Sequence, residues 1–246
     1  MRIENFTIES RNWLPAFGIQ RQFTAGAAAR PGTPDYSARC RQLEELGGDC
    51  YHVLRLDAKS WSLMIGDACG KGLPAALTMS HVQASLRAAA FFGNDLSSLL
   101  RSVNRQVYAS SPGDRYATLF YAAFDTSTRM LRYVNAGHNP PIIMRQDGSV
   151  AWLERGGAPA GMFSDWTYEE GSVQLRSGDL ILAYTDGVTE SLNRHGEEWG
   201  LDGLLNTAAV NRCRCTSDLV DAIFQSMDRF SGGLQHDDAT VLAVRV

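Results

Sequence analysis

Apolar positions along the chain fall into short runs separated by polar or glycine-containing turns, and two of these runs end at an aspartate. Residues 61–65 form one run, which Gly66 and Asp67 follow. Residues 179–185 form the other, which Asp186 follows directly. Short apolar runs between turn residues are typical of buried strands. The pattern therefore predicts two buried strands, each with a carboxylate at its exit.

A further strand precedes the first run and is expected to pair with it as a hairpin. Residues 50–56 alternate roughly in period two, and residues 57–60 are typical of a turn. A turn centred in the middle of 57–60 sets Asp49 opposite Ala68, next to Asp67. Carboxylates that meet in this way raise each other's pKa, so a cation or a shared proton is needed to relieve the repulsion.

The remaining pattern predicts strands joined by hairpins and helices gathered in two blocks. We expect helices over 73–91, 95–109 and 217–230, and further strands over 116–124, 130–136, 142–145, 150–153, 172–175 and 239–246. If the last strand runs antiparallel to residues 179–185, Asp186 and Asp237 meet. Hairpin-joined strands with clustered helices indicate an α+β fold in which helices cover antiparallel sheets.

The first 35 residues show few periodic apolar runs, and residues 25–34 are typical of a loop. We therefore expect an N-terminal extension or linker over 1–35. The rest of the chain, residues 36–246, is expected to form one large domain.

The composition excludes several classes of function. The chain has 246 residues, of which 44% are hydrophobic and 20% charged, and its net charge is −4. A nucleic-acid-binding protein would normally present a basic face, so we expect no nucleic-acid partner. No apolar run approaches the ~18 residues of a membrane span, and no signal peptide is evident, so we expect a cytoplasmic protein that does not enter a membrane. The five scattered cysteines do not form a zinc motif and are expected as free thiols.

Four aspartates at predicted strand ends are candidate metal ligands: Asp49, Asp67, Asp186 and Asp237. Oxygen ligands without a nearby set of histidines or cysteines favour magnesium, manganese or calcium, and the chain has no EF-hand loop. A pair of divalent ions ~3.5–4 Å apart would hold a water of lowered pKa in line with a phosphoryl group. A single aspartate is more often a solvated cap than a ligand, so this prediction rests on the four together.

Several motifs occur in the order and with the spacing of a known family. They are Gly47-Gly48-Asp49, the run from Gly66 to Gly72, Tyr116-Ala117-Thr118, the run from Asn135 to Pro141, the run from Tyr184 to Glu190, and Asp237-Asp238-Ala239-Thr240. From about residue 40 onward, the chain resembles the SpoIIE branch of the PPM (type-2C-like) metal-dependent serine/threonine phosphatases. The resemblance implies a four-layer αββα sandwich of two antiparallel sheets flanked by helices.

The resemblance also implies a centre of two divalent ions, Mn²⁺ or Mg²⁺, and a role for each matching residue. These are Asp67 as the bridge between both ions, the backbone carbonyl of Ala68 on one ion, Asp186 and Asp237 as further ligands, Asp49 as the acidic partner at the other ion, and Asp238 at an outer or additional-metal position. Asp67, Asp186 and Asp49 would then carry the catalytic chemistry.

The implied activity is hydrolysis of phosphoserine or phosphothreonine in a protein by a metal-activated water. The implied substrate in this branch is a STAS-type anti-sigma-factor antagonist in bacterial signalling. A different interpretation is a catalytically weak metal-binding module that sequesters a phosphoprotein partner; the complete set of aspartates argues against it. The sequence leaves open whether the chain forms a homodimer.

Two positions depart from the family pattern. Many relatives have a second acidic residue three positions after Asp49, where this chain has His52, so we expect altered metal affinity or preference. Cys69 stands where relatives of this branch usually have a small polar residue. We interpret it as a buried, inert thiol, and the alternative is a thiol whose oxidation slows the enzyme.

Overall fold

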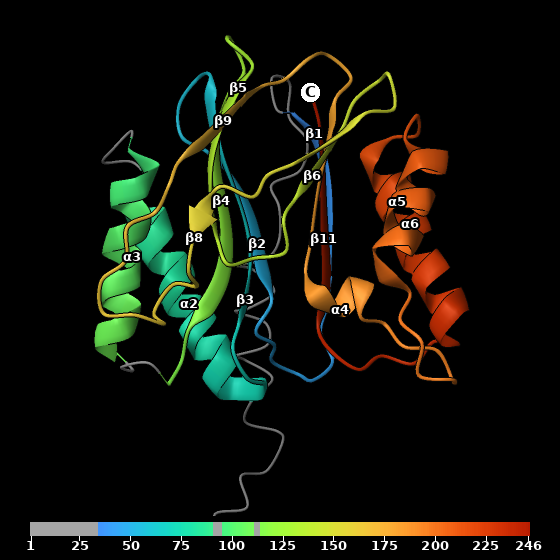
Figure 1. Cartoon of the computed structure of the whole chain (residues 1–246), viewed down its shortest axis with the longest axis horizontal. Helices are drawn as coiled ribbons and strands as arrows, with labels where there is room; N and C mark the ends of the chain where they lie inside the picture. The colour runs from blue at the N-terminus through green and yellow to red at the C-terminus, as the bar shows by residue number, and fades with distance from the viewer. Residues whose placement is uncertain (1–33, 91–94, 111–113) are drawn as a thin grey trace, which may run out of the picture.

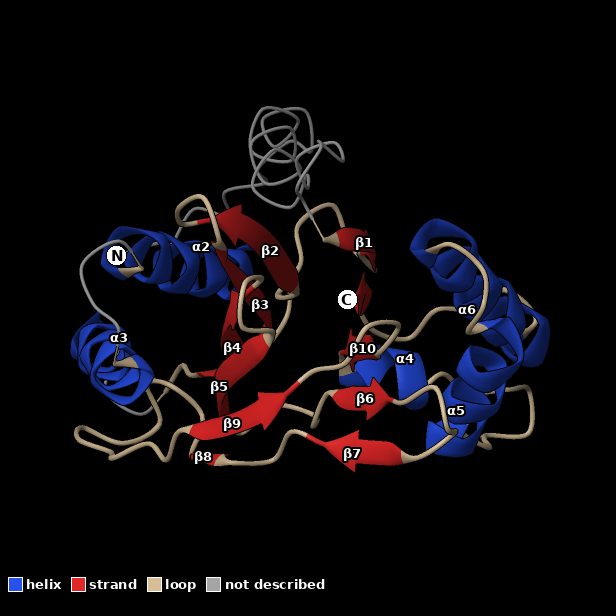
Figure 2. Cartoon of the chain, turned by 90° about the horizontal axis from the view of Figure 1, so that it is seen from above, coloured by secondary structure: helices blue, strands red, loops and turns tan. Residues whose placement is uncertain are grey.

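The computed structural model describes residues 34–90, 95–110 and 114–246, and the structural statements below concern these residues. They form two β-sheets that pack face to face between two pairs of helices (Figure 1). Seen from above in Figure 2, α2 (Gly72–Ala89) and α3 (Leu96–Ser110) lie outside one sheet, and α5 (Gly200–Asn211) and α6 (Thr216–Ser231) lie outside the other. The predicted αββα sandwich is confirmed.

Sheet A has the strand order β1-β11-β10-β6-β7, and all its pairs are antiparallel. Its strands are β1 (Asp35–Arg41), β11 (Ala239–Arg245), β10 (Leu180–Tyr184), β6 (Ile142–Met144) and β7 (Val150–Trp152). The four-residue helix α4 (Asp186–Thr189) follows β10 directly.

Sheet B has the strand order β2-β3-β4-β5-β8, and β9 also pairs with β5. Its strands are β2 (Cys50–Arg55), β3 (Ser60–Ala68), β4 (Ala117–Asp125), β5 (Met130–Ala136), β8 (Gly156–Gly157) and β9 (Gly171–Gln174). The short β5–β8 pair is parallel, and the other pairs are antiparallel.

The alternation of side chains along the strands divides the core into three apolar layers. On β3, Leu63 and Ile65 face sheet A, whereas Met64 and Ala68 face α2 and α3. A third layer lies between sheet A and α5–α6. Because side chains alternate with period two, Asp67 points into the same space between the sheets as Ile65 does. The two-sided burial explains why this strand reads as a continuous apolar run.

The predicted helices and strands are confirmed to within a few residues, and four elements of the described residues escaped prediction. The missed elements are β1, β8, α4 and α5. In β1 the inward side chains, Tyr36, Ala38 and Cys40, are only partly buried against the inter-sheet core, so the strand lacks a strong apolar pattern. The predicted extension over 1–35 lies outside the described residues, except for its last two.

The predicted register of the β2–β3 hairpin is wrong by one residue. Cys50 pairs with Gly66, and the amide of Ala68 donates to the carbonyl of Gly48 at 3.2 Å. The shift arises in the turn, where both Leu56 and Asp57 donate their amides to the carbonyl of Ser60, so the turn is tighter than expected. No helix within the described ranges is both long and apolar enough to cross a membrane.

Candidate metal centre

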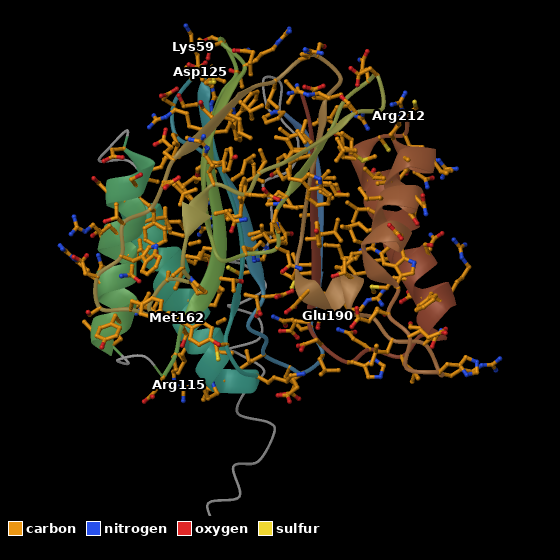
Figure 3. The ribbon with its side chains drawn as sticks, in the orientation of Figure 1. Lys59, Arg115, Asp125, Met162, Glu190 and Arg212 are labelled. Carbon is orange, nitrogen blue, oxygen red and sulfur yellow. The ribbon has the colours of Figure 1, made fainter. Side chains whose placement is uncertain are left out.

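The predicted site residues come from segments far apart in the sequence and lie at one end of the two sheets. Asp67 lies near the end of β3, Asp186 follows β10, and Asp237 precedes β11. In Figure 3, Arg115 and Glu190 are labelled near this end, and Lys59 is labelled near the opposite end. The antiparallel pairing of β10 with β11 brings Asp186 and Asp237 together, as the sequence predicted.

Asp67 is the centre of the acidic cluster. Burial, together with the charges of Asp186, Asp237 and Asp238, raises the pKa of Asp67 to about 7. β3 ends here in a glycine-rich turn, so the carboxylate is held at the edge of a buried strand. A carboxylate in this environment favours a proton or a cation as its partner.

Asp186 approaches Asp237 because a glycine follows it. A Cβ atom on Gly187 would lie 1.9 Å from the carbonyl oxygen of Asp238, so only glycine lets α4 approach the segment before β11 this closely. Burial raises the pKa of Asp186, and Asp237 contributes to the increase. The two carboxylates are therefore electrostatically coupled across the β10–β11 pair.

Asp238 binds backbone amides instead of adding a free carboxylate. Its Oδ1 accepts from the amide of Leu43 at 2.7 Å, and its Oδ2 accepts from the amide of Gly48 at 2.8 Å. Asp238 thus connects the segment before β2 to the start of β11 by hydrogen bonds. This places Asp238 in a positioning role around the cluster.

Asp49 is buried between the sheets and bound by two hydroxyl groups. Its Oδ2 accepts from Thr185 Oγ1 at 2.7 Å and from Thr240 Oγ1 at 2.6 Å. Thr185 Oγ1 in turn accepts from the amide of Thr240 at 2.8 Å. Burial raises the pKa of Asp49, and the neighbouring charge of Asp67 adds to this increase. Asp49 therefore links sheet B to β10 and β11 while lying beside Asp67.

The loop before β2 leaves room for two oxygen donors. A Cβ atom on Gly48 would lie 2.8 Å from the Ala68 carbonyl oxygen and 2.9 Å from Asp67 Oδ1. These two oxygens therefore face the same small space, which only a glycine leaves free. Carboxylate and carbonyl oxygens are the donors that Mg²⁺ and Mn²⁺ prefer, so the donor chemistry fits the implied ions.

The side chains are not assembled into a complete ligand shell. Within the described ranges, no three His, Cys, Asp or Glu side chains are grouped closely enough to hold one ion. The oxygens of Asp237 have other partners, because its Oδ2 lies 3.0 Å from Lys71 Nζ and its Oδ1 accepts from the amide of Asp238 at 2.9 Å. The acidic residues thus converge, and Asp237 is paired with a lysine.

His138 does not join the acidic cluster. Its Nδ1 lies 2.9 Å from Thr118 Oγ1, and that hydroxyl lies 3.4 Å from the carbonyl oxygen of Asp67. Asn135 holds the turn by accepting from the amide of His138 at 2.7 Å. Burial lowers the pKa of His138 to about 4, so the ring is neutral near pH 7. Through Thr118, the ring of His138 supports the strand that carries Asp67.

The two departures from the family pattern lie in different surroundings. His52 is buried on the face of β2 that meets Tyr121, away from the acidic cluster, and burial lowers its pKa to about 3. Cys69 is half-buried and interacts with the Tyr116 side chain. The interpretation of Cys69 as a buried thiol is therefore wrong, because the strand ends before it and the following turn is exposed.

Sequence reasoning missed four residues that organise the site: Thr118, Thr185, Thr240 and Lys71. Thr185 and Thr240 each lie in or beside a strand, in a motif that also carries an aspartate, whereas the motif that contains Thr118 carries none. That adjacency is the signal that could have revealed Thr185 and Thr240. No comparable signal identified the partner of Lys71, since Asp237 is 166 positions away and only the fold joins them.

Comparisons with known proteins identify the family of this chain. The family model for stage II sporulation protein E matches residues 57–246. The chain belongs to the SpoIIE family. It is 30% identical to the phosphoserine phosphatase RsbU of Bacillus subtilis over 94% of this chain and 68% of that protein. The assignment made from the sequence motifs, including the phosphatase class, is confirmed.

Solved structures of other proteins show the same fold. The RsbU and RsbW domains of a Mycobacterium tuberculosis protein superpose with a TM-score of 0.73 at 27% identity, covering 87% of this chain and 61% of that one. The SiaA PP2C domain of Pseudomonas aeruginosa superposes with a TM-score of 0.78 at 22% identity, covering 94% of both chains. This chain thus spans about two thirds of RsbU and of the mycobacterial chain, and nearly all of the SiaA domain.

Proposed function

We propose that this SpoIIE-family protein removes phosphate from phosphoserine or phosphothreonine in a protein, using two divalent ions, Mn²⁺ or Mg²⁺. The observation that carries this proposal is the convergence of Asp67, Asp186 and Asp237 from three strand ends onto one acidic cluster. Such a cluster is unstable without a cation, because each carboxylate raises the pKa of the others.

The residues that would hold the ions follow from the family motifs and from the oxygens of the cluster. Asp67 would bridge both ions, with the Ala68 carbonyl on one and Asp186 and Asp237 as further ligands. Asp49 would be the acidic partner at the other ion. When bound, a pair of such ions lowers the pKa of water and neutralises charge on the phosphoryl oxygens.

The chain's other residues orient these ligands. Thr185 and Thr240 donate to one oxygen of Asp49, which fixes the direction in which its second oxygen points. Asp238 holds the amide of Gly48 and so keeps the space next to Asp67 Oδ1 and the Ala68 carbonyl open. Preorganisation of this kind keeps ligand oxygens in position without reorganisation during the reaction.

The substrate class is inferred from the relatives. RsbU carries the name phosphoserine phosphatase, and it matches nearly the whole of this chain. We therefore infer that the substrate is a phosphoprotein, with a STAS-type anti-sigma-factor antagonist as the first candidate. The net charge of −4 gives no support to a nucleic-acid partner.

The test is hydrolysis of p-nitrophenyl phosphate and of a phosphoserine peptide in Mn²⁺-containing buffer. Wild type should hydrolyse both, and Asp67→Ala should lose nearly all activity while remaining folded by circular dichroism. Asp202→Asn, at an exposed position on α5, is the matched control and should behave as wild type. If wild type and Asp67→Ala are equally inactive while both bind a phosphoprotein, the protein is a sequestering module instead.

A further inference from the structure

Lys71 lies beside the acidic cluster and has two short contacts there. Its Nζ lies 3.0 Å from Asp237 Oδ2 and donates to the carbonyl of His236 at 3.1 Å. The chain contains two lysines, and the other, Lys59, is exposed in the turn between β2 and β3. Figure 3 labels Lys59 at the end of the molecule away from Glu190.

The backbone around Lys71 directs it toward the segment before β11. Gly70 and Gly72 both have positive φ, of 95° and 65°, so the loop folds back sharply on each side of the lysine. The ammonium then contacts two consecutive residues, His236 and Asp237, across 165 and 166 positions of sequence. Attraction by Asp237, Asp238 and Glu44 raises the pKa of Lys71, so it stays protonated at neutral pH.

The lysine contacts an oxygen that a divalent ion would need. Asp237 Oδ1 accepts from a backbone amide, and Asp237 Oδ2 faces the ammonium. An ammonium and a divalent ion cannot share one carboxylate oxygen without strong like-charge repulsion. Metal binding at Asp237 Oδ2 therefore requires Lys71 to move.

We propose that Lys71 is an internal counter-ion of Asp237 in the metal-free protein, and that a divalent ion displaces it when it binds. This inference rests on the proposed metal centre, since Asp237 would be one of its ligands. Lys71 then lowers the affinity for metal, and its release reports metal binding at Asp237. The effect is modest, because both side chains are about half exposed, at 52% and 50%, and exposed pairs are screened by water.

The first test measures the chemical reactivity of the two lysines. Wild-type protein is acetylated briefly with and without Mn²⁺, and mass spectrometry compares Lys71 with Lys59 in the same sample. Acetylation of Lys71 relative to Lys59 should rise roughly two- to fivefold with Mn²⁺, as expected for the loss of an exposed ion pair. In metal-free Asp237→Asn, Lys71 should already show the higher reactivity.

The second test measures metal affinity by calorimetry. Lys71→Met should bind Mn²⁺ roughly two- to fivefold more tightly than wild type, because no ammonium competes for Asp237. Lys71→Arg keeps the positive charge and should stay close to wild type. Lys59→Met is the matched control and should leave the affinity unchanged.

The outcomes separate this inference from the proposed function. If wild type binds Mn²⁺ and hydrolyses phosphate esters while Lys71 reactivity and the affinity of Lys71→Met do not change, the counter-ion role is refuted and the phosphatase proposal stands. If wild type binds no divalent ion, both proposals fail together.

Discussion

At the scale of single residues, the aspartates of the cluster differ in what they contact. Asp238 is bound by two backbone amides, and Asp49 is bound by two threonine hydroxyls. Asp67 has carboxylates as its main electrostatic neighbours, and burial raises its pKa to about 7. The residue type is the same in each case, so the surroundings decide which aspartate positions the site and which attracts a cation.

Removing one hydroxyl should show how much the Asp49 network contributes to stability. In Thr240→Val the buried Asp49 loses a donor at 2.6 Å, so the free energy of unfolding should fall by about 1–3 kcal/mol. Thr240→Ser keeps a hydroxyl and should lose less. Urea unfolding of the metal-free protein measures both changes. Equal stability of the valine variant and wild type would contradict this role for Thr240.

At the scale of elements, the site depends on turns that bring strand ends together closely. Gly48 lies against the Ala68 carbonyl and Asp67 Oδ1, and Gly187 lies against the carbonyl of Asp238. A side chain at either position would separate segments that must touch. The glycines next to the aspartates in the sequence motifs are therefore required sterically, because they let two backbone segments approach closely.

Gly48→Ala tests whether the site requires glycine for this close approach. The added methyl group would lie 2.8 Å from the Ala68 carbonyl oxygen, so that oxygen and Asp67 must shift. We expect Mn²⁺ affinity to fall by about tenfold or more, as for other changes next to metal ligands, while the fold persists. Calorimetry gives the affinity and thermal melting gives the stability.

The matched control is Gly148→Ala in the turn between β6 and β7. Gly148 has a φ of 85° and no atom within 4 Å of an added Cβ, so the control strains a turn far from the cluster. It should lose stability and keep its metal affinity. A loss of affinity as large as in Gly48→Ala would show that general destabilisation causes both effects.

At the scale of the whole molecule, the acidic cluster costs stability when no metal is bound. The pKa of Asp67 rises from 3.8 to about 7 on folding, so between these pH values the native state holds a proton that the unfolded chain has lost. The stability that Asp67 contributes is therefore fully present below about pH 4 and is lost as pH rises toward 7. Buried His52 and His138 have pKa values lowered to about 3 and about 4, so their effect on stability is opposite to that of Asp67. The stability that they contribute is present at neutral pH and is lost as pH falls.

The pH dependence of unfolding should isolate the effect of Asp67. The difference in unfolding free energy between Asp67→Asn and metal-free wild type should grow in favour of the variant from pH 4 to pH 7, because asparagine does not titrate. Saturating Mn²⁺ should stabilise wild type and leave the variant nearly unchanged, since ligand binding to the native state adds stability. A difference that stays constant across this range would contradict the raised pKa.

Much of the architecture follows from local pattern. The period-two runs, the helical stripes and the Asp95 that caps α3 by accepting from the amide of Ser97 at 3.1 Å are properties of short segments. Propensity and alternation act over a few residues, so the sequence alone determined these elements and set the aspartates at strand ends. The motifs then identified the family and the ligand candidates.

The contacts between distant segments were decided only by the tertiary structure. The one-residue shift of the β2–β3 register, the binding of Asp49 by Thr185 and Thr240, and the Lys71–Asp237 pair all depend on how separate elements pack. Strand β1 escaped prediction for the same reason, since pairing with β11 and packing against the inter-sheet core define it. Side-chain partners depend on packing across layers, and local sequence carries no information about which layer will lie opposite.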